Sequence, residues 1–148
     1  MADITRRADV VWEGGLATGS GQFDVGSGVF REQPVTWASR VEAPGGKTSP
    51  EELIAAAHAS CYAMAFSHTL GEAGHPPERL QVSSVVTFAP LPAGGFKVAK
   101  SELTVRGRVA GLDLTRFEQL AREGEAGCPI SNALRGNVEI ALTAELEA

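Results

Sequence analysis

The sequence predicts one α+β domain over residues 1–148, in which antiparallel sheets wrap around a long central helix. Three strand-like segments precede a long apolar helix. Two strands, a second helix and a final strand follow, giving the order β-β-β-α-β-β-α-β. A length of 148 residues and a hydrophobic content of 43% are enough for one core without disulfides or metals.

Three segments near the N-terminus are typical of strands. Residues 3–15 alternate loosely and end in a Gly-Gly turn signal, and residues 16–28 form a glycine-rich second strand. In residues 35–43, alternation places Trp37 on one face of a third strand and Arg40 on the other. We therefore expect three strands before the first helix.

The first helix has a well-marked beginning. Thr48 or Ser49 suits the N-cap, Pro50 suits the first helical position, and two glutamates occupy the first turn. The helix is expected to continue to Gly71 or Gly74, and its middle is apolar nearly all round, as in a buried helix. Because a chain of this size would struggle to enclose such a helix, we expect a twofold homodimer whose sheets enclose both helices.

The second half of the chain contains the remaining elements. Residues 80–91 and 96–109 are strand-like and are joined by a Pro-Ala-Gly-Gly turn. A helix is expected over residues 113–125, followed by a short helical turn within residues 127–136. Residues 137–147 show the clearest alternation in the sequence and predict the last strand.

Charge and hydropathy exclude several classes of function. The net charge of −5 argues against binding to nucleic acid, which requires clustered Lys and Arg. No apolar run has the length of a signal peptide or of a membrane span, so we expect a cytoplasmic protein with no membrane contact. In the cytoplasm two cysteines are expected to stay reduced, and a disulfide between them would be transient.

Cys128 lies in the segment GCPIS, where Pro129 suits the first position of a helical turn and places Cys128 at its N-cap. Unpaired backbone N–H groups at that position stabilise a thiolate and lower its pKa. A small residue that merely begins a turn would look the same. On the local sequence alone these two interpretations are equally supported.

Cys61 lies in the middle of the long helix, far from a helix terminus, among Ala, Ser and Tyr. Apolar surroundings raise the pKa of a thiol and leave it inert. To act as a nucleophile, Cys61 requires a cation, either His58 one turn earlier or an arginine from another segment. The local sequence favours a core cysteine.

Two segments together resemble the OsmC/Ohr family of thiol peroxidases. They are SPEELIAAAHASCYAMAF at residues 49–66 and GCPIS at residues 127–131, and their cysteines are 67 positions apart (128 − 61). The WEG near the start, the GEAG after the helix and the final alternating strand also fit, so the resemblance covers nearly the whole chain. It implies an OsmC-like fold in an intertwined homodimer, with two active sites at the subunit interface.

The resemblance also implies the chemistry and assigns roles to residues. Cys61 is the peroxidatic thiol, which becomes a sulfenic acid, and Cys128 is the resolving thiol that condenses with it to a disulfide. Arg40, which stands just before the helix as in the OsmC branch, stabilises the thiolate, and Glu51 orients this arginine. Arg31 is a weaker alternative to Arg40. Neither a cofactor nor a metal is implied.

The expected substrate is an organic hydroperoxide, with hydrogen peroxide reduced less well, in defence against oxidative or osmotic stress. A dithiol, such as a lipoyl protein, or a small thiol would regenerate the enzyme. A hydrophobic approach to Cys61 would favour organic peroxides, because an organic tail gains free energy on burial. Candidate lining residues, each also compatible with ordinary core, are Tyr62, Met64, Phe66, Phe23, Phe30, Trp37 and Ile130.

Geometry limits how Glu51 can act. In one straight helix, Glu51 and Cys61 are separated by roughly 15 Å along the axis, so their side chains cannot touch. A long side chain such as that of Arg40 must bridge them, unless the helix bends or the two residues come from different subunits. Without the family resemblance, Glu51 would be interpreted as an ordinary first-turn glutamate.

Three alternatives compete with a peroxidase. In a Cys–His hydrolase His58 would be the base, but no oxyanion hole or third orienting residue is recognisable. In a zinc site Cys61 and Cys128 would bind with His58 or His68, but no C-x-x-C pair is present. In a non-enzymatic α+β binding domain both cysteines would be unreactive.

Overall fold

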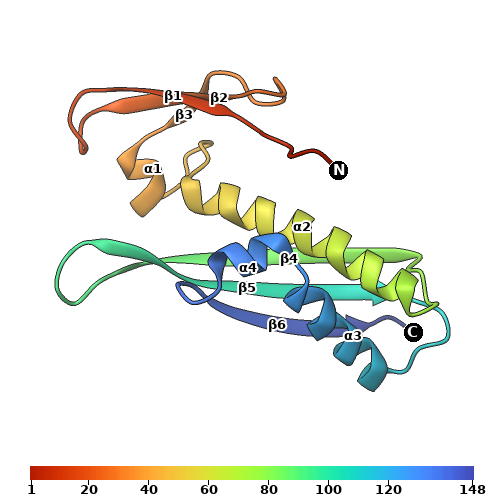
Figure 1. The fold of residues 1–148 in the computed structure, drawn as a ribbon. Coiled ribbons are helices and arrows are strands. Elements are labelled where there is room, and N and C mark those ends of the chain that lie inside the picture. The colour runs from red at the N-terminus through yellow and green to blue at the C-terminus, as the bar shows by residue number, and fades with distance from the viewer. The chain divides into compact units, whose positions relative to one another are not determined.

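The structure is a computed structural model that describes residues 1–148. Its elements follow the order β1-β2-β3-α1-α2-β4-β5-α3-α4-β6 (Figure 1). The predicted order of six strands and two long helices is therefore confirmed, α4 matches the short helical turn expected within residues 127–136, and α1 is an addition. The chain divides into two compact units, Met1–Pro50 and Glu51–Ala148.

The first unit is an antiparallel sheet followed by a short helix. β1 (Ala8–Glu13), β2 (Ser20–Val25) and β3 (Gln33–Val35) pair in the order β1-β2-β3. After β3 the chain turns into α1 (Trp37–Val41). The third predicted strand, residues 35–43, is therefore wrong beyond its first residue.

Helix capping explains this difference. Thr36 is the N-cap of α1, where its hydroxyl accepts the Ser39 N–H and the Ser39 hydroxyl accepts the Thr36 N–H, both at 3.1 Å. This reciprocal capping box satisfies the backbone N–H groups of both residues and starts a helix where the alternation predicts a strand. Alternation over so few residues is a weaker signal than the cap, so Arg40 lies in the last turn of a helix.

The second unit contains a sheet of three long strands. β4 (Arg79–Pro90) and β5 (Phe96–Arg108) form an antiparallel hairpin, and β6 (Glu139–Leu146) pairs with β5 in parallel. The expectation of purely antiparallel sheets is wrong for this last pair. Two helices lie between β5 and β6 in the chain, and a connection of that length lets the returning strand run parallel.

Three helices of the second unit pack on one face of this sheet (Figure 1). They are α2 (Pro50–Glu72), α3 (Leu114–Ala126) and α4 (Pro129–Leu134). α2 begins at the predicted proline and buries a stripe with a period of four residues. The members of this stripe are His58, Tyr62, Phe66 and Leu70.

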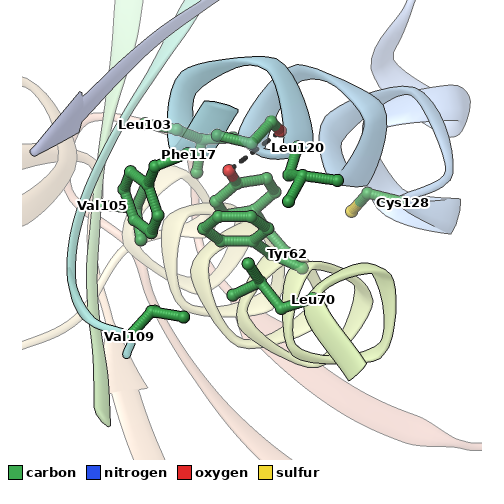
Figure 2. Close-up of a cluster of buried hydrophobic side chains, with 10 residues drawn as sticks. Tyr62, Leu70, Leu103, Val105, Val109, Phe117, Leu120 and Cys128 are labelled. Atoms are coloured by element: carbon green, nitrogen blue, oxygen red, sulfur yellow. Dashed lines mark hydrogen bonds between the residues drawn. The ribbon is translucent and has the colours of Figure 1, made fainter. Parts of the chain in front are cut away.

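The core lies between this stripe, α3 and β5 (Figure 2). Phe66 stacks on Tyr62, with ring centroids 5.7 Å apart, and meets Phe117 of α3 edge-on at 5.2 Å. A Cβ atom at Gly124 of α3 would lie 3.0 Å from the Cα of Phe66, so this glycine lets α3 approach α2 closely. This approach brings the end of α3, and the start of α4 after it, beside the middle of α2.

Candidate active site

Cys61 lies on α2 next to the buried stripe and is half-buried. Its neighbour Tyr62 is fully buried, and its hydroxyl donates to the Ala121 carbonyl of α3 at 3.1 Å. The helix is therefore held at this point both by ring packing and by a buried hydrogen bond. Because Tyr62 points into the core, the side chain of the preceding residue, Cys61, lies at the border of the core rather than inside it.

Cys128 occupies the N-cap of α4, as the sequence predicts, and Pro129 begins the helix. Its side chain is fully buried, and its Sγ accepts the Ser131 N–H at 3.5 Å. Its own N–H donates to the Glu125 carbonyl at 3.1 Å, which closes the turn between α3 and α4. The thiol thus has a fixed direction because the backbone on both sides is hydrogen-bonded.

The two thiols lie beside each other and are both reduced. The side chain of Cys61 lies close enough to that of Cys128 and to the Ile130 N–H for both to influence its pKa. Burial raises the pKa of Cys61, the Ile130 N–H lowers it, and the neighbouring Cys128 raises it again. The net pKa of Cys61 is above the ordinary value.

His58, one turn before Cys61, is fully buried and uses both ring nitrogens. Nδ1 is hydrogen-bonded to the Ser101 hydroxyl of β5 at 2.6 Å, and Nε2 to the Ser131 hydroxyl of α4 at 2.8 Å. Burial lowers the pKa of His58, while the charge of Glu125 opposes this shift. The imidazole is therefore held neutral by its surroundings, and its hydrogen bonds go to serines rather than to Cys61.

Arg40 lies in the first unit, in the last turn of α1, with its guanidinium carbon 5.9 Å from the centre of the Trp37 ring. The weaker alternative, Arg31, lies in the same unit, with its guanidinium against Gly28. Neither arginine belongs to the unit that brings the two cysteines together.

Glu51 stands in the first turn of α2 and is 7% exposed. A carboxylate so deeply buried requires polar partners, which an ordinary surface glutamate does not. Because α2 runs unbroken from Pro50 to Glu72, ten residues separate Glu51 from Cys61 along one helix. The predicted separation of roughly 15 Å therefore holds.

The predicted lining residues separate into two groups. Tyr62 and Phe66 are fully buried in the core, so they pack α2 rather than line an approach to the thiol. Met64 is 69% exposed, and Ile130 is half-buried against the core cluster beside Cys61. Phe23, Phe30 and Trp37 belong to the first unit, where Phe23 and Phe30 meet edge-on at 6.3 Å.

The family profile described as "OsmC-like protein" matches residues 43–143. The chain belongs to the OsmC family. The resemblance predicted from the two cysteine segments is thereby confirmed.

Relatives of this OsmC-family chain cover nearly its whole length. It is 37% identical to peroxiredoxin OsmC of Escherichia coli (strain K12) over 93% of the chain and 94% of the relative. The crystal structure of an organic hydroperoxide resistance protein OsmC from Legionella pneumophila matches with a TM-score of 0.74 and 27% identity, covering 98% and 99%. That of OhrB from Bacillus subtilis matches at 0.72 and 27%, covering 94% and 98%.

The geometry of this OsmC-family chain also bears on the competing interpretations. The general base of a hydrolase must lie within hydrogen-bonding reach of its nucleophile. Both ring nitrogens of His58 are instead hydrogen-bonded to serine hydroxyls, so His58 is not placed to act as a base for Cys61. No group of three or more His, Cys, Asp and Glu side chains is arranged to hold a metal ion. None of the helices has the length and hydropathy required to cross a membrane.

Sequence reasoning missed the serines around His58. Ser101 and Ser131 are fully buried, although neither stands in a segment whose pattern distinguishes it from a surface serine. The one available signal was His58 itself, since a histidine in an apolar stripe requires two polar partners. The partners' identity depends on which strand and which turn pack against α2.

Proposed function

We propose that this chain is a cysteine-based peroxidase that reduces organic hydroperoxides to alcohols, and hydrogen peroxide less well. The observation that carries this proposal is the closeness of the two free thiols, Cys61 and Cys128, each of which is placed by a different helix. Two neighbouring thiols, one half-buried and one fully buried, suit a reaction in which the first meets the peroxide and the second resolves it. The membership of the OsmC family and the peroxiredoxin relative support the same chemistry.

The reaction has two steps within the protein. The Cys61 thiolate attacks the terminal peroxide oxygen, the O–O bond breaks, and the alkoxide takes a proton to leave as the alcohol. Cys61 is now a sulfenic acid. The Cys128 sulfur then attacks the Cys61 sulfur, an S–S bond forms, and the hydroxyl leaves with the Cys128 proton as water.

The first step requires a cation near Cys61, because burial and Cys128 both raise the pKa of that thiol. We assign this role to Arg40, whose guanidinium is long enough and always charged. Glu51 then orients the guanidinium and compensates its charge. The burial of Glu51 supports this role, because a buried carboxylate is stable only with hydrogen-bonding or cationic partners.

A homodimer is part of the proposal, as is a single OsmC-like domain over residues 1–148. Several apolar side chains are exposed on this chain, and large exposed apolar patches mark surfaces that bind other proteins. They include Val10, Val11, Met64 and Val85, which are 63%, 68%, 69% and 60% exposed. An intertwined dimer would cover such residues and would complete two active sites at its interface.

Apolar surroundings of Cys61 support the preference for organic substrates. Ala65 and Ile130 pack with Cys61 against the core, and an organic tail gains about 25 cal/mol for each Å² of apolar surface that it buries there. Hydrogen peroxide has no such surface. Two of the similar solved structures are named organic hydroperoxide resistance proteins.

An external dithiol, from a lipoyl protein or a small thiol, is proposed to reduce the disulfide. The reducing cytoplasm is the compartment that supplies such thiols, and oxidative or osmotic stress supplies the peroxides.

Competitive kinetics with cumene hydroperoxide and hydrogen peroxide test this function, followed by mass mapping of the oxidised protein. One equivalent of organic peroxide should remove both free thiols and produce a Cys61–Cys128 disulfide within one chain. Faster consumption of the organic peroxide is expected. Thiol counts unchanged by peroxide would favour a non-enzymatic binding domain instead.

A further inference from the structure

The proposed cycle leaves a buried histidine beside the thiols without a role. His58 lies one helical turn before Cys61, is fully buried, and is hydrogen-bonded at both ring nitrogens. Burying an imidazole requires that both nitrogens be satisfied, and an apolar residue would fill the same space without that requirement. The residues to which His58 is hydrogen-bonded therefore indicate which parts of the chain it holds in place.

One of these partners belongs to the turn that carries Cys128. Ser131 binds Nε2 of His58 through its hydroxyl at 2.8 Å, and its backbone N–H donates to the Sγ of Cys128 at 3.5 Å. A single residue thus connects the imidazole on α2 with the resolving thiol. Because Cys61 stands on the same helix as His58, both thiols are tied to one rigid element.

The other partner fixes the imidazole from the sheet side. Nδ1 of His58 is 2.6 Å from the Ser101 hydroxyl of β5, and that hydroxyl is 3.0 Å from the Ser84 hydroxyl of β4. Rotation of the ring would break both of its hydrogen bonds in the core. The hydrogen bond between His58 and Ser131 therefore has a fixed direction and length.

A second side-chain tie holds the other end of α4. This helix is six residues long, and an ion pair of Arg135 with Glu125 at 2.7 Å holds its C-terminal end. The two side chains are 48% and 15% exposed, and they lie away from Cys128. The buried bond to His58 lies at the end of α4 that carries Cys128.

We propose that His58 is a positioning residue for disulfide formation, which holds the Cys128 turn against Cys61 through the hydroxyl of Ser131. This inference rests on the proposed function for its biological meaning. In the step concerned, the S–S bond forms, the S–O bond of the Cys61 sulfenic acid breaks, and water leaves with the Cys128 proton. His58 exchanges no proton in this step, since its two nitrogens remain bound to serine hydroxyls.

Four substitutions separate this role from simple packing. His58→Asn retains a polar group near the Nδ1 position and loses the one that reaches Ser131. His58→Gln places its amide near the Nε2 position and retains that link. Ser131→Ala removes the same link from the other side and leaves the backbone N–H on Cys128 in place. Ser101→Ala is the matched control, because it removes a buried hydrogen bond from the opposite nitrogen.

The primary measurement is the equilibrium between the Cys61–Cys128 disulfide and glutathione, which involves no peroxide. A misplacement of about 1 Å in a reacting group is enough to change rates up to a hundredfold, so His58→Asn and Ser131→Ala should each lower the effective concentration of the pair about tenfold. For this two-electron couple, tenfold corresponds to about 30 mV. His58→Gln and Ser101→Ala should remain within roughly twofold of the parent.

The second measurement is the lifetime of the sulfenic acid after one equivalent of cumene hydroperoxide. It should lengthen about tenfold in His58→Asn and Ser131→Ala, while the rate of the first step stays unchanged. If both variants close the disulfide as readily as Ser101→Ala and differ from the parent only in thermal stability, His58 has a packing role and the proposal is wrong. Ser131→Ala decides the matter if His58→Asn does not fold.

These outcomes distinguish the inference from the proposed function. A parent protein that does not react with peroxide, but whose glutathione equilibrium depends on the His58–Ser131 link, would disprove the peroxidase and retain the positioning role. A parent that reacts with peroxide at a closure rate independent of the link would do the reverse. A parent that forms no disulfide in either assay would contradict both.

Discussion

The two cysteines of this protein differ in almost every local property. Cys128 is fully buried at a helix N-cap, accepts a backbone N–H, and is directed by hydrogen bonds on both sides. Cys61 is half-buried in the middle of a helix, and its surroundings raise its pKa. The two thiols therefore differ in exposure, since Cys61 is partly exposed and Cys128 is fully buried.

This difference separates two questions, which thiol is accessible and which group lowers its pKa. The unit Glu51–Ala148 brings the two thiols close together and leaves Cys61 partly exposed. Arg40, which we propose as the activating cation, belongs to the other unit. The following experiments test this division, beginning with the largest effect.

Replacing each cysteine in turn by serine tests which thiol reacts first with the peroxide. Cys61→Ser should reduce peroxide consumption to the uncatalysed background, because serine is not a nucleophile at neutral pH. Cys128→Ser should complete the first turnover and then accumulate sulfenic acid, which dimedone labelling and mass spectrometry detect. The opposite pattern would assign the peroxidatic role to Cys128.

Replacement of Arg40, the proposed cation, tests what lowers the pKa of Cys61. Arg40→Ala should slow the first step about a hundredfold, since an adjacent opposite charge lowers a pKa by roughly one to three units. Its rate should also rise at higher pH than that of the parent, because a higher pKa of Cys61 delays thiolate formation. Stopped-flow rates across pH measure both effects. Arg31→Ala is the matched control; a loss confined to Arg31→Ala would reverse the assignment.

The close approach of α3 to α2 determines where the Cys128 turn meets Cys61, and two glycines test it. Gly124→Ala should lower the free energy of unfolding by about 1–3 kcal/mol, because the added Cβ would lie 3.0 Å from the Cα of Phe66. Gly71→Ala, in α2 with nothing within 4 Å, should raise it by up to about 1 kcal/mol. Urea titrations at one protein concentration compare them. Equal effects at both positions would show that the crossing tolerates a methyl group.

The smallest expected effect concerns the influence of one thiol on the other. Cys128 raises the pKa of Cys61 both through the interaction of its side chain with the thiol and through its charge. Cys128→Ala removes both contributions, so the pKa of Cys61 should fall and its thiolate fraction at neutral pH should rise. A first turnover roughly twofold faster than in the parent is expected, from thiolate absorbance and stopped-flow rates. A higher pKa in this variant would mean that Cys128 stabilises the thiolate.

Much of the fold is predictable because its signals are local. Pro50 marks the start of α2, and the Cys-Pro pair marks the start of α4, since both depend on how proline fits a first helical turn. The prediction failed where a pattern was short, as at α1, where a capping box outweighs alternation. It also failed for the direction of β6, because strand direction depends on the path of the chain between strands.

The pairing of Cys61 with Cys128 shows the same limit of sequence-based prediction for the functional site. Their identity as a pair came from a family resemblance, since neither local segment indicates that residues 61 and 128 meet. The contact exists because α2 and α3 pack closely at Gly124 and because the turn after α3 returns toward α2. Neither cause is local in sequence.

The sequence by itself determined the class of fold, the beginnings of the main helices and the N-cap position of Cys128. These depend on residue types, spacing and backbone chemistry within a few residues, whereas two motifs far apart in the chain indicated the OsmC family. Only the tertiary structure decided that Cys61 and Cys128 lie close together and that His58 is joined to Ser101 and Ser131. Side chains from three distant segments meet there because burying the apolar stripe of α2 against the sheet leaves one orientation in which its histidine is also satisfied.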